Sequence, residues 1–188
     1  ASMTLRYAPG ESFVNSKQRR VPVSLDAPVF TLTHAMGFKG VLGGEYNFNR
    51  TEASIWKRFW LPASWGKIDC SVKAGAEWNT VPFPLLILPE ANLSYITQRE
   101  TFCLINNMEF LNDRFASMSI SYDMNGKLFN RIPLLKNLKW REMFRVRALW
   151  GTLTDKNNPF KSSNPDLFRF PTRDGKFTSF VMDPKVPY

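Results

Sequence analysis

The stretch that decides the fold runs Lys67-Ile-Asp-Cys-Ser-Val-Lys-Ala-Gly-Ala-Glu-Trp-Asn79. Its apolar side chains occupy every second position, and these are Ile68, Cys70, Val72, Ala74, Ala76 and Trp78. An amphipathic helix would repeat its apolar positions at intervals of three and four, so this period of two predicts a β-strand with one apolar and one polar face. The stretch also reaches the length of about 9–11 residues that a tilted strand needs to cross a bilayer.

The same alternation recurs along the chain. Ala116, Met118, Ile120, Tyr122 and Met124 alternate with four serine or acidic positions and an asparagine, and Phe144, Val146, Ala148 and Trp150 alternate with Arg145, Arg147, Leu149 and Gly151. Further strands are predicted at residues 1–7, 29–36, 44–61 and 101–110, the last of them joined to the next strand by a hairpin turn at 111–114. The sequence therefore predicts an all-β, antiparallel fold with about seven strands.

Alternation alone leaves two architectures open. In a soluble β-sandwich the apolar face points into the core, whereas in a membrane β-barrel it faces lipid and the polar face lines the lumen. Three features favour a partial transmembrane β-barrel: strand length, the small residues Ala74 and Ala76, and the aromatic residues Trp78 and Trp150 at strand ends. The connections at 8–28, 80–100 and 152–188 are long, as on outer-membrane barrels.

A membrane barrel assigns each alternating residue to one side. The residues expected to face lipid are Ile68, Cys70, Val72, Ala74, Ala76, Trp78, Met118, Ile120, Tyr122, Phe144, Val146 and Trp150. The residues expected to face the lumen are Lys67, Asp69, Lys73, Glu77, Arg145 and Arg147, with the charges along residues 67–77 forming a ladder of ion pairs within one strand. A constriction lined by such charges would favour anions.

Composition narrows the function classes. The chain carries a formal net charge of +9, but its Lys and Arg residues are scattered and form no run of five or six, so we expect no nucleic-acid partner. No stretch of 18 apolar residues is present, which excludes a membrane-spanning helix. The two cysteines, Cys70 and Cys103, have no metal-binding or redox spacing, and the single histidine, His34, has no accompanying catalytic motif. We therefore expect no enzyme activity, no metal and no cofactor.

An apolar patch lies between prolines at residues 82–89. The prolines exclude a central strand there. The patch either packs against a neighbouring loop, docks a partner, or plugs the barrel.

A series of motifs spans most of the chain in a fixed order. It comprises Thr51-Glu-Ala-Ser-Ile-Trp-Lys-Arg-Phe-Trp-Leu61, Trp65-Gly-Lys-Ile-Asp69, Val81-Pro-Phe-Pro-Leu-Leu-Ile-Leu-Pro89, Asn107-Met-Glu-Phe-Leu-Asn-Asp-Arg114, Phe129-Asn-Arg-Ile-Pro-Leu-Leu135, Leu138-Lys-Trp-Arg-Glu142 and Leu153-Thr-Asp-Lys-Asn-Asn-Pro159. The series resembles the carboxy-terminal barrel of Bacteroidota outer-membrane proteins of unknown function, whose full-length members usually carry an amino-terminal carboxypeptidase-regulatory-like domain. That barrel is similar in turn to the surface-antigen and barrel-assembly superfamily. The resemblance implies an outer-membrane location and an antiparallel barrel, and it implies no reaction.

These observations lead to one leading hypothesis and two alternatives. We expect residues 1–188 to form a single domain, a portion of a barrel in the bacterial outer membrane that is incomplete at both ends. Its expected partners are the lipid bilayer and other outer-membrane proteins of a surface complex, and its expected role is transport, assembly or scaffolding. The first alternative is a soluble, basic β-sandwich or barrel that binds acidic polymers through its loops. The second is a hydrolase that uses Asp69 or Glu77.

Overall fold

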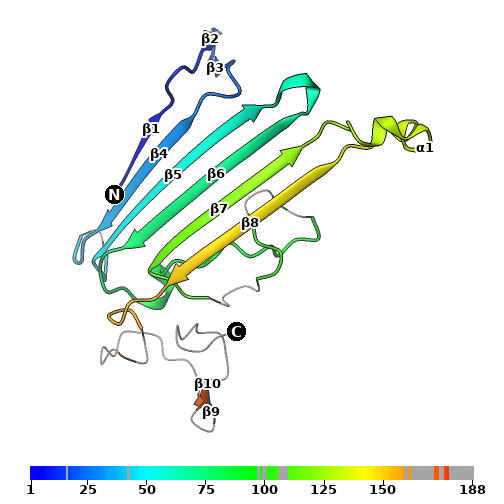
Figure 1. Cartoon of the computed structure of the whole chain (residues 1–188). Helices are drawn as coiled ribbons and strands as arrows, with labels where there is room; N and C mark the ends of the chain where they lie inside the picture. The colour runs from blue at the N-terminus through cyan, green and yellow to red at the C-terminus, as the bar shows by residue number, and fades with distance from the viewer. Residues whose placement is uncertain are drawn as a thin grey trace.

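A computed structural model describes residues 1–15, 17–41, 43–96, 98, 101–105, 110–158, 161, 172–173 and 176–177. Six strands form one antiparallel sheet in the order β1-β4-β5-β6-β7-β8. Their bounds are Ser2–Tyr7 (β1), Val29–Gly37 (β4), Phe48–Trp60 (β5), Lys67–Glu77 (β6), Arg114–Asp123 (β7) and Met143–Thr152 (β8). Each strand pairs with the next along the sheet, so the sheet is a meander, and Figure 1 shows it as a single open layer with β1 and β8 at its edges.

The connections alternate between the two ends of this meander. One end, called the α1 end below, carries residues 8–28, 61–66 and 124–142. These include a small hairpin of β2 (Phe13–Asn15) and β3 (Arg20–Pro22), the turn η1 (Pro62–Ser64), η3 (Phe129–Arg131) and the helix α1 (Pro133–Lys136). The opposite end carries residues 38–47, 78–113 and, directly after β8, residues 153–158, with η2 (Phe83–Leu85). Later in the chain, β9 (Thr172–Arg173) and β10 (Lys176–Phe177) form a short antiparallel pair.

Two glycines allow close approaches that the strand register requires. Gly66 turns the chain from β5 into β6 with a φ of 89°, and a Cβ atom there would lie 1.8 Å from the carbonyl oxygen of Asp123. Gly75 in β6 lies opposite Phe115 in β7, and a Cβ atom there would lie 2.5 Å from the Phe115 ring. Covering a strand glycine with a neighbouring aromatic ring restores the packing that the glycine lacks and fixes the register of the pair.

The predicted strand at 101–110 and its hairpin are wrong where the structure describes them. Phe102 forms only an isolated bridge with Ala91, residues 103–105 are bends, and residues 106–109 lie outside the described residues. Asn112, expected in the hairpin turn, instead pairs with Ile87 through two backbone hydrogen bonds of 2.8 and 3.0 Å. Leu104 is 97% exposed, so the alternation of this segment does not mark the buried face of a strand, and the long connection from β6 to β7 folds on itself.

The small buried core lies at the end of the sheet opposite α1. Val81, Leu86 and Leu111 form its centre, and Phe48, Leu85, Leu88 and Leu153 pack around it. The apolar patch at 82–89 supplies much of this cluster, which confirms that the patch packs within the chain. Because the cluster joins the connections that follow β6 and β8 to the start of β5, it fixes these loops against the sheet and leaves the apolar face of the strands uncovered.

Candidate functional site: the two faces of the sheet

The apolar face is continuous across all six strands. Residues directly opposite each other in an antiparallel pair lie on the same face, so the register assigns the following to it: Met3, Leu5 and Tyr7; Phe30, Leu32, His34 and Met36; Thr51, Ala53, Ile55, Lys57 and Phe59; Ile68, Cys70, Val72, Ala74 and Ala76; Arg114, Ala116, Met118, Ile120 and Tyr122; Phe144, Val146, Ala148, Trp150 and Thr152. Apart from Trp78, every residue expected to face lipid lies in this set.

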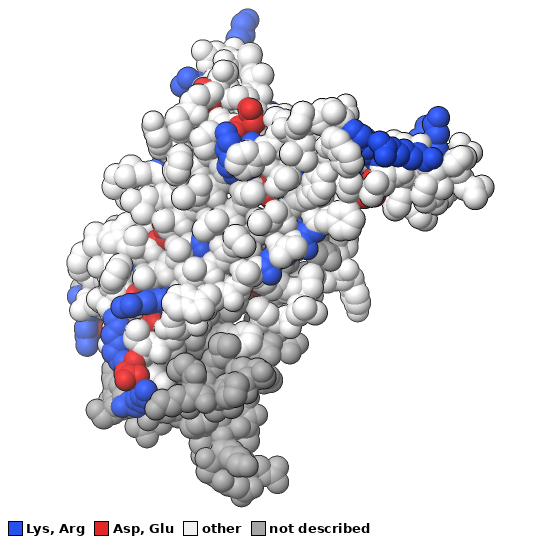
Figure 2. All heavy atoms as spheres, in the orientation of Figure 1, with Lys and Arg blue, Asp and Glu red and all other residues white. Residues whose placement is uncertain are grey.

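This face is open to its surroundings. Leu5 is 53% exposed, Val72 44% and Val146 65%, positions that range from one edge of the sheet to the other. Figure 2 shows the same face: its surface is largely uncharged, and most of its Lys and Arg residues gather toward the two ends. A monomeric soluble protein rarely exposes a contiguous apolar patch larger than a few hundred Å², and such patches mark contact with a membrane or a partner.

Five of the six strands are as long as a membrane-crossing strand needs to be, and the edge strand β1, with 6 residues, is shorter. Strands β4 to β8 contain 9, 13, 11, 10 and 10 residues, and a transmembrane strand needs about 9–11. The apolar positions of β6 run from Ile68 to Ala76, about 27 Å along the strand, or about 21 Å across a bilayer at a tilt of about 40°. Trp78 follows directly and is 52% exposed, and its indole Nε1 donates to the Thr51 hydroxyl at 2.9 Å. An indole at the boundary of an apolar band is typical of interfacial aromatic residues.

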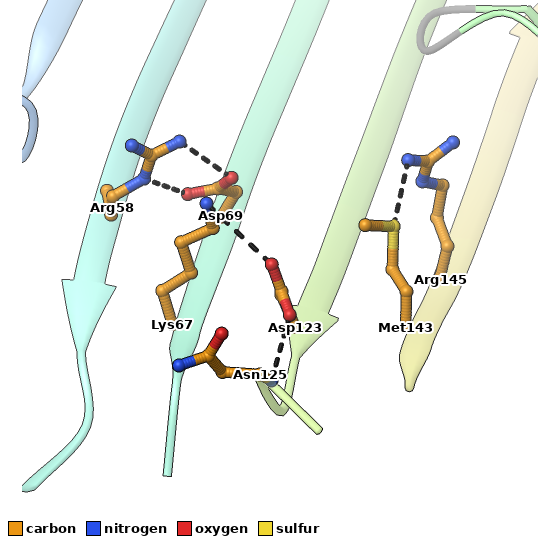
Figure 3. Close-up of polar contacts among 7 residues, drawn as sticks. All are labelled: Arg58, Lys67, Asp69, Asp123, Asn125, Met143 and Arg145. Carbon is orange, nitrogen blue, oxygen red and sulfur yellow. Dashed lines mark hydrogen bonds and ion pairs between the residues drawn. The ribbon is translucent and has the colours of Figure 1, made fainter. Parts of the chain in front are cut away.

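The opposite face is polar and carries ion pairs that cross between neighbouring elements. Arg58 of β5 donates to both carboxylate oxygens of Asp69 of β6, at 2.6 and 3.0 Å, and Lys67 lies 3.8 Å from Asp123 of β7 (Figure 3). The expected ladder of pairs within residues 67–77 is wrong, because Lys67 and Asp69 pair with neighbouring strands and Lys73 pairs with Glu90 of the β6–β7 connection. The antiparallel register places Arg58 directly opposite Asp69 and Lys67 directly opposite Asp123. A pair two residues apart on one strand does occur in β5, between Arg50 and Glu52.

Arg58 contacts two aromatic rings in addition to Asp69. Its guanidinium lies 5.4 Å from the ring of Trp56 and 5.6 Å from the ring of Trp60, two residues away on either side along β5. The side chain is 15% exposed, and that of Asp69 is 27% exposed. A bidentate pair of this kind between aromatic rings has a defined geometry, since the planar fork matches the carboxylate and the rings attract the cation.

Arg145 and Arg147 extend the polar face to the edge strand β8. The register sets them opposite Ser121 and Ser119 of β7. Arg145 contacts the sulfur of Met143 at 3.6 Å (Figure 3), and Arg147 donates to the backbone oxygen of Gln98 at 3.0 Å.

The connection from β6 to β7 covers part of this polar face. Glu90 lies 3.3 Å from Lys73, and Leu88, Pro89 and Phe102 line a cavity of about 610 Å³ between the connection and the strands. The same cavity is lined by six cationic side chains, Arg50, Arg58, Lys67, Lys73, Arg145 and Arg147, and by three carboxylates, Asp69, Glu90 and Asp123. The cavity therefore has an excess of positive charge, and it lies on the face that a barrel would turn inward.

Glu77 has a different role from the other charged residues expected in the lumen. It is 1% exposed, and its Oε1 accepts from the backbone N–H of Asn49 at 2.8 Å. Next to it along the sheet, the fully buried Asp113 accepts from the Thr154 backbone and hydroxyl and, at 3.1 Å, from the Asn157 side chain. Asn157 also accepts from the backbone N–H of Val81 at 3.0 Å. These residues anchor three loops at the end of the sheet and are not available as acid–base groups facing a cavity.

Within the described residues, no group of histidine, cysteine and carboxylate side chains could hold a metal ion. His34 hydrogen-bonds the Thr51 hydroxyl at 2.9 Å, and Cys70 is half-buried on the apolar face. In the same part of the chain, no helix has the length and apolar character to cross a bilayer. At the α1 end, the Arg6 hydrogen bond lowers the pKa of the Glu11 carboxyl below its usual range.

Sequence reasoning missed several members of the polar face. Arg50, Arg58, Glu90 and Asp123 were not assigned to the lumen, although Arg50, Arg58 and Asp123 belong to alternating stretches. The period-two pattern of β5 contains the signal for Arg58, because Ser54, Trp56 and Arg58 share one face there. Glu90 had no such signal, since it reaches the face from a loop.

The architecture defined by these observations is a six-stranded antiparallel meander with one exposed apolar face and one polar, partly covered face. The chain belongs to the family of unknown function (DUF5686): the model of its C-terminal domain matches residues 1–161. The matched range includes all six strands of the sheet. Neither the curated proteins nor the solved structures contain a match to the chain.

Proposed function

We propose that this chain is the membrane-spanning sheet of an outer-membrane β-barrel protein, with its apolar face toward lipid and its polar face toward the lumen. The observation that carries the proposal is which of the two faces is exposed and which is covered. In a soluble β-sandwich the apolar face is the covered one. Here the apolar face is exposed, and the β6–β7 connection lies over the polar face.

The open edges of the sheet bear on the role of the protein. A strand edge in the hydrocarbon region would leave backbone groups without hydrogen-bond partners at several kcal/mol each, so β1 and β8 must pair with further strands in a bilayer. In the cell those strands come from a longer chain or from other outer-membrane proteins of a surface complex, and in an experiment on this chain alone the exposed edges of further copies supply them. We therefore propose a non-enzymatic role in transport, assembly or scaffolding in a bacterial outer membrane of the Bacteroidota type that the sequence resemblance implies.

A second candidate function follows from the cavity on the polar face. Its six cationic side chains outnumber its three carboxylates. This charge balance supports a soluble protein that binds an acidic polymer, provided that the apolar face is covered by another chain. That candidate predicts detergent-free solubility and binding that collapses as salt is raised.

Membrane extraction tests the proposal. The full chain is expressed with an outer-membrane export signal, and the membrane fraction is washed with alkaline carbonate and then extracted with detergent. The proposal predicts that the chain resists the carbonate wash and is released by detergent. Recovery of folded protein in the soluble fraction without detergent would contradict it and would favour the acidic-polymer candidate.

A further inference from the structure

The connection between β7 and β8, residues 124–142, has an exposed surface of one charge sign. It carries Lys127, Arg131, Lys136, Lys139 and Arg141 and one acidic residue, Glu142. Arg131, Lys136, Lys139 and Arg141 are exposed, and none of these four forms an ion pair with another described residue. Figure 2 shows Lys and Arg gathered on this projection beyond the end of the sheet.

The single carboxylate is turned inward. Glu142 is 6% exposed, and its side chain accepts from the backbone N–H of Phe129. Its backbone oxygen accepts from the backbone N–H of Met124 at 3.1 Å. Glu142 therefore contacts other residues of the same connection, and the positive charges lie on the outer surface of that connection.

Apolar side chains are exposed between these cations. Leu134 is 85% exposed, Trp140 55% and Leu138 51%, with Ile132 at 45%. Trp140 packs edge-on against Phe129, with ring centroids 6.3 Å apart, and the rest of its surface is exposed. Basic side chains interleaved with Leu and Trp are typical of segments that lie in the interfacial region of a membrane, where apolar groups enter the acyl boundary and cations meet phosphate.

The segment stands at the membrane boundary that the apolar face defines. It extends from β7 and β8 at the end where β5 turns into β6 (Figure 1). At this end Lys127 also lies 4.4 Å from the ring of Trp65, and Tyr122 donates to the Trp65 backbone oxygen at 3.1 Å. Aromatic rings and cations together are typical of the headgroup level.

The two ends of the sheet differ in charge. The connections at the α1 end contain eight Lys or Arg residues and three Asp or Glu residues, whereas residues 38–47, 78–113 and 153–161 at the other end contain four and six. Among these connections the excess of positive charge therefore lies at the α1 end, and an anionic surface would attract that end.

We propose that residues 124–142 form a docking segment for the phosphate headgroups of an anionic lipid layer, and that they hold the α1 end of the sheet at that layer. The geometry of this inference rests on the proposed membrane-spanning sheet. The cations contact lipid phosphates, while Leu134, Leu138 and Trp140 enter the edge of the acyl region.

Lipid-specific quenching tests the docking segment. The full chain is reconstituted into phosphatidylcholine vesicles with or without phosphatidylglycerol, carrying a bimane label at Asn137→Cys in a background of Cys70→Ala and Cys103→Ser. We expect brominated phosphatidylglycerol to quench the label more strongly than brominated phosphatidylcholine. The variant Lys136→Gln/Lys139→Gln should weaken the preference on the order of 20-fold, since each basic residue near an anionic surface contributes a roughly fivefold preference. High salt should have the same effect.

The control removes two exposed cations from the opposite end, Lys39→Gln/Lys161→Gln, of which Lys161 is paired with Asp155 at 2.8 Å, and should keep the preference. Equal quenching by the two lipids, equal effects of the two variants, or no quenching at all would overturn the inference. So would salt-sensitive binding of DNA or heparin that phosphatidylglycerol vesicles fail to displace. Failure of the unlabelled chain to insert into pure phosphatidylcholine vesicles would instead contradict the proposed membrane-spanning sheet, so the two failures are distinguishable.

Discussion

The two faces of the sheet contain similar numbers of side chains, but they differ in how exposed these side chains are and in whether they have polar partners. On the apolar face, Val72, Ile55 and Met118 lie side by side and are all 43–47% exposed, with no polar partner to satisfy. On the polar face, Asp69 and Lys67 each have an oppositely charged neighbour on an adjacent strand. Charges that are paired and covered, beside apolar groups that are not, are the reverse of the arrangement in a soluble β-sandwich, whose apolar face is the covered one.

The difference between the two faces also bears on which contacts stabilise the sheet. A water-soluble sheet is stabilised mainly by burying its apolar face. In this chain the described core is small, and the contacts that join distant segments are largely polar: strand pairing, Arg58 with Asp69, and the Asp113 anchor. Such contacts remain effective in a bilayer, where unpaired backbone and side-chain polar groups are costly.

The largest expected effect comes from placing a charge on the apolar face. Val72→Arg should lower the free energy of unfolding of the vesicle-inserted chain by about 2–4 kcal/mol, the cost of an arginine at the lipid face near the bilayer midplane. The measurement is a urea titration of the chain in lipid vesicles. Ser71→Arg is the matched control, because Ser71 adjoins Val72 in β6 and lines the polar cavity. If the two variants were equally stable, the apolar face would not face lipid.

Much of this two-faced sheet could be predicted from the sequence. The strand predicted from Lys67 to Asn79 is observed from Lys67 to Glu77, and the strand predicted at 44–61 is observed as Phe48–Trp60. Period two is a local signal, and it holds wherever the segment pairs with a neighbouring strand, the edge strands β1 and β8 included. It failed at residues 101–105, where the same alternation belongs to a loop that has no strand beside it.

The polar contacts could not be predicted, for a different reason. Which charge meets Asp69 depends on the register of β5 against β6, and that register is set by the turn at Gly66. Asp113 and Asn157 are 44 residues apart in sequence, and neither position carries a local signal that they meet. The presence of one apolar and one polar face can therefore be predicted from the sequence, whereas the network of polar contacts can be identified only in the folded structure.

The second-largest expected effect comes from removing a side chain of that polar network. Asn157→Ala should destabilise the chain by about 2 kcal/mol, because it leaves the backbone N–H of Val81 and the backbone oxygen of Asn79 without their partners in a buried site. Urea titration and proteolysis of the β6–β7 connection are the measurements. Asn137→Ala, an exposed position in the 124–142 connection, should change neither. Equal sensitivity of the two variants would mean that the anchor does not hold the loops.

The smallest effect compares two arginine–carboxylate pairs that both lie along the polar side of the sheet. Arg58→Gln should destabilise the chain by about 1 kcal/mol, since Arg58 makes two charge-assisted hydrogen bonds in a partly covered site. Arg6→Gln removes a pair with the same two-bond geometry to Glu11, in which the Arg6 side chain is 47% exposed at the edge of the sheet and the Glu11 side chain 5%, so a smaller loss than that of Arg58→Gln is expected. A double-mutant cycle with Asp69→Asn separates the pair from the loss of the aromatic contacts, because only the pair contributes to the coupling energy. A coupling near zero for Arg58 and Asp69 would mean that this pair is as well solvated as an exposed pair, and the polar face would then lose its distinction from an ordinary solvated surface.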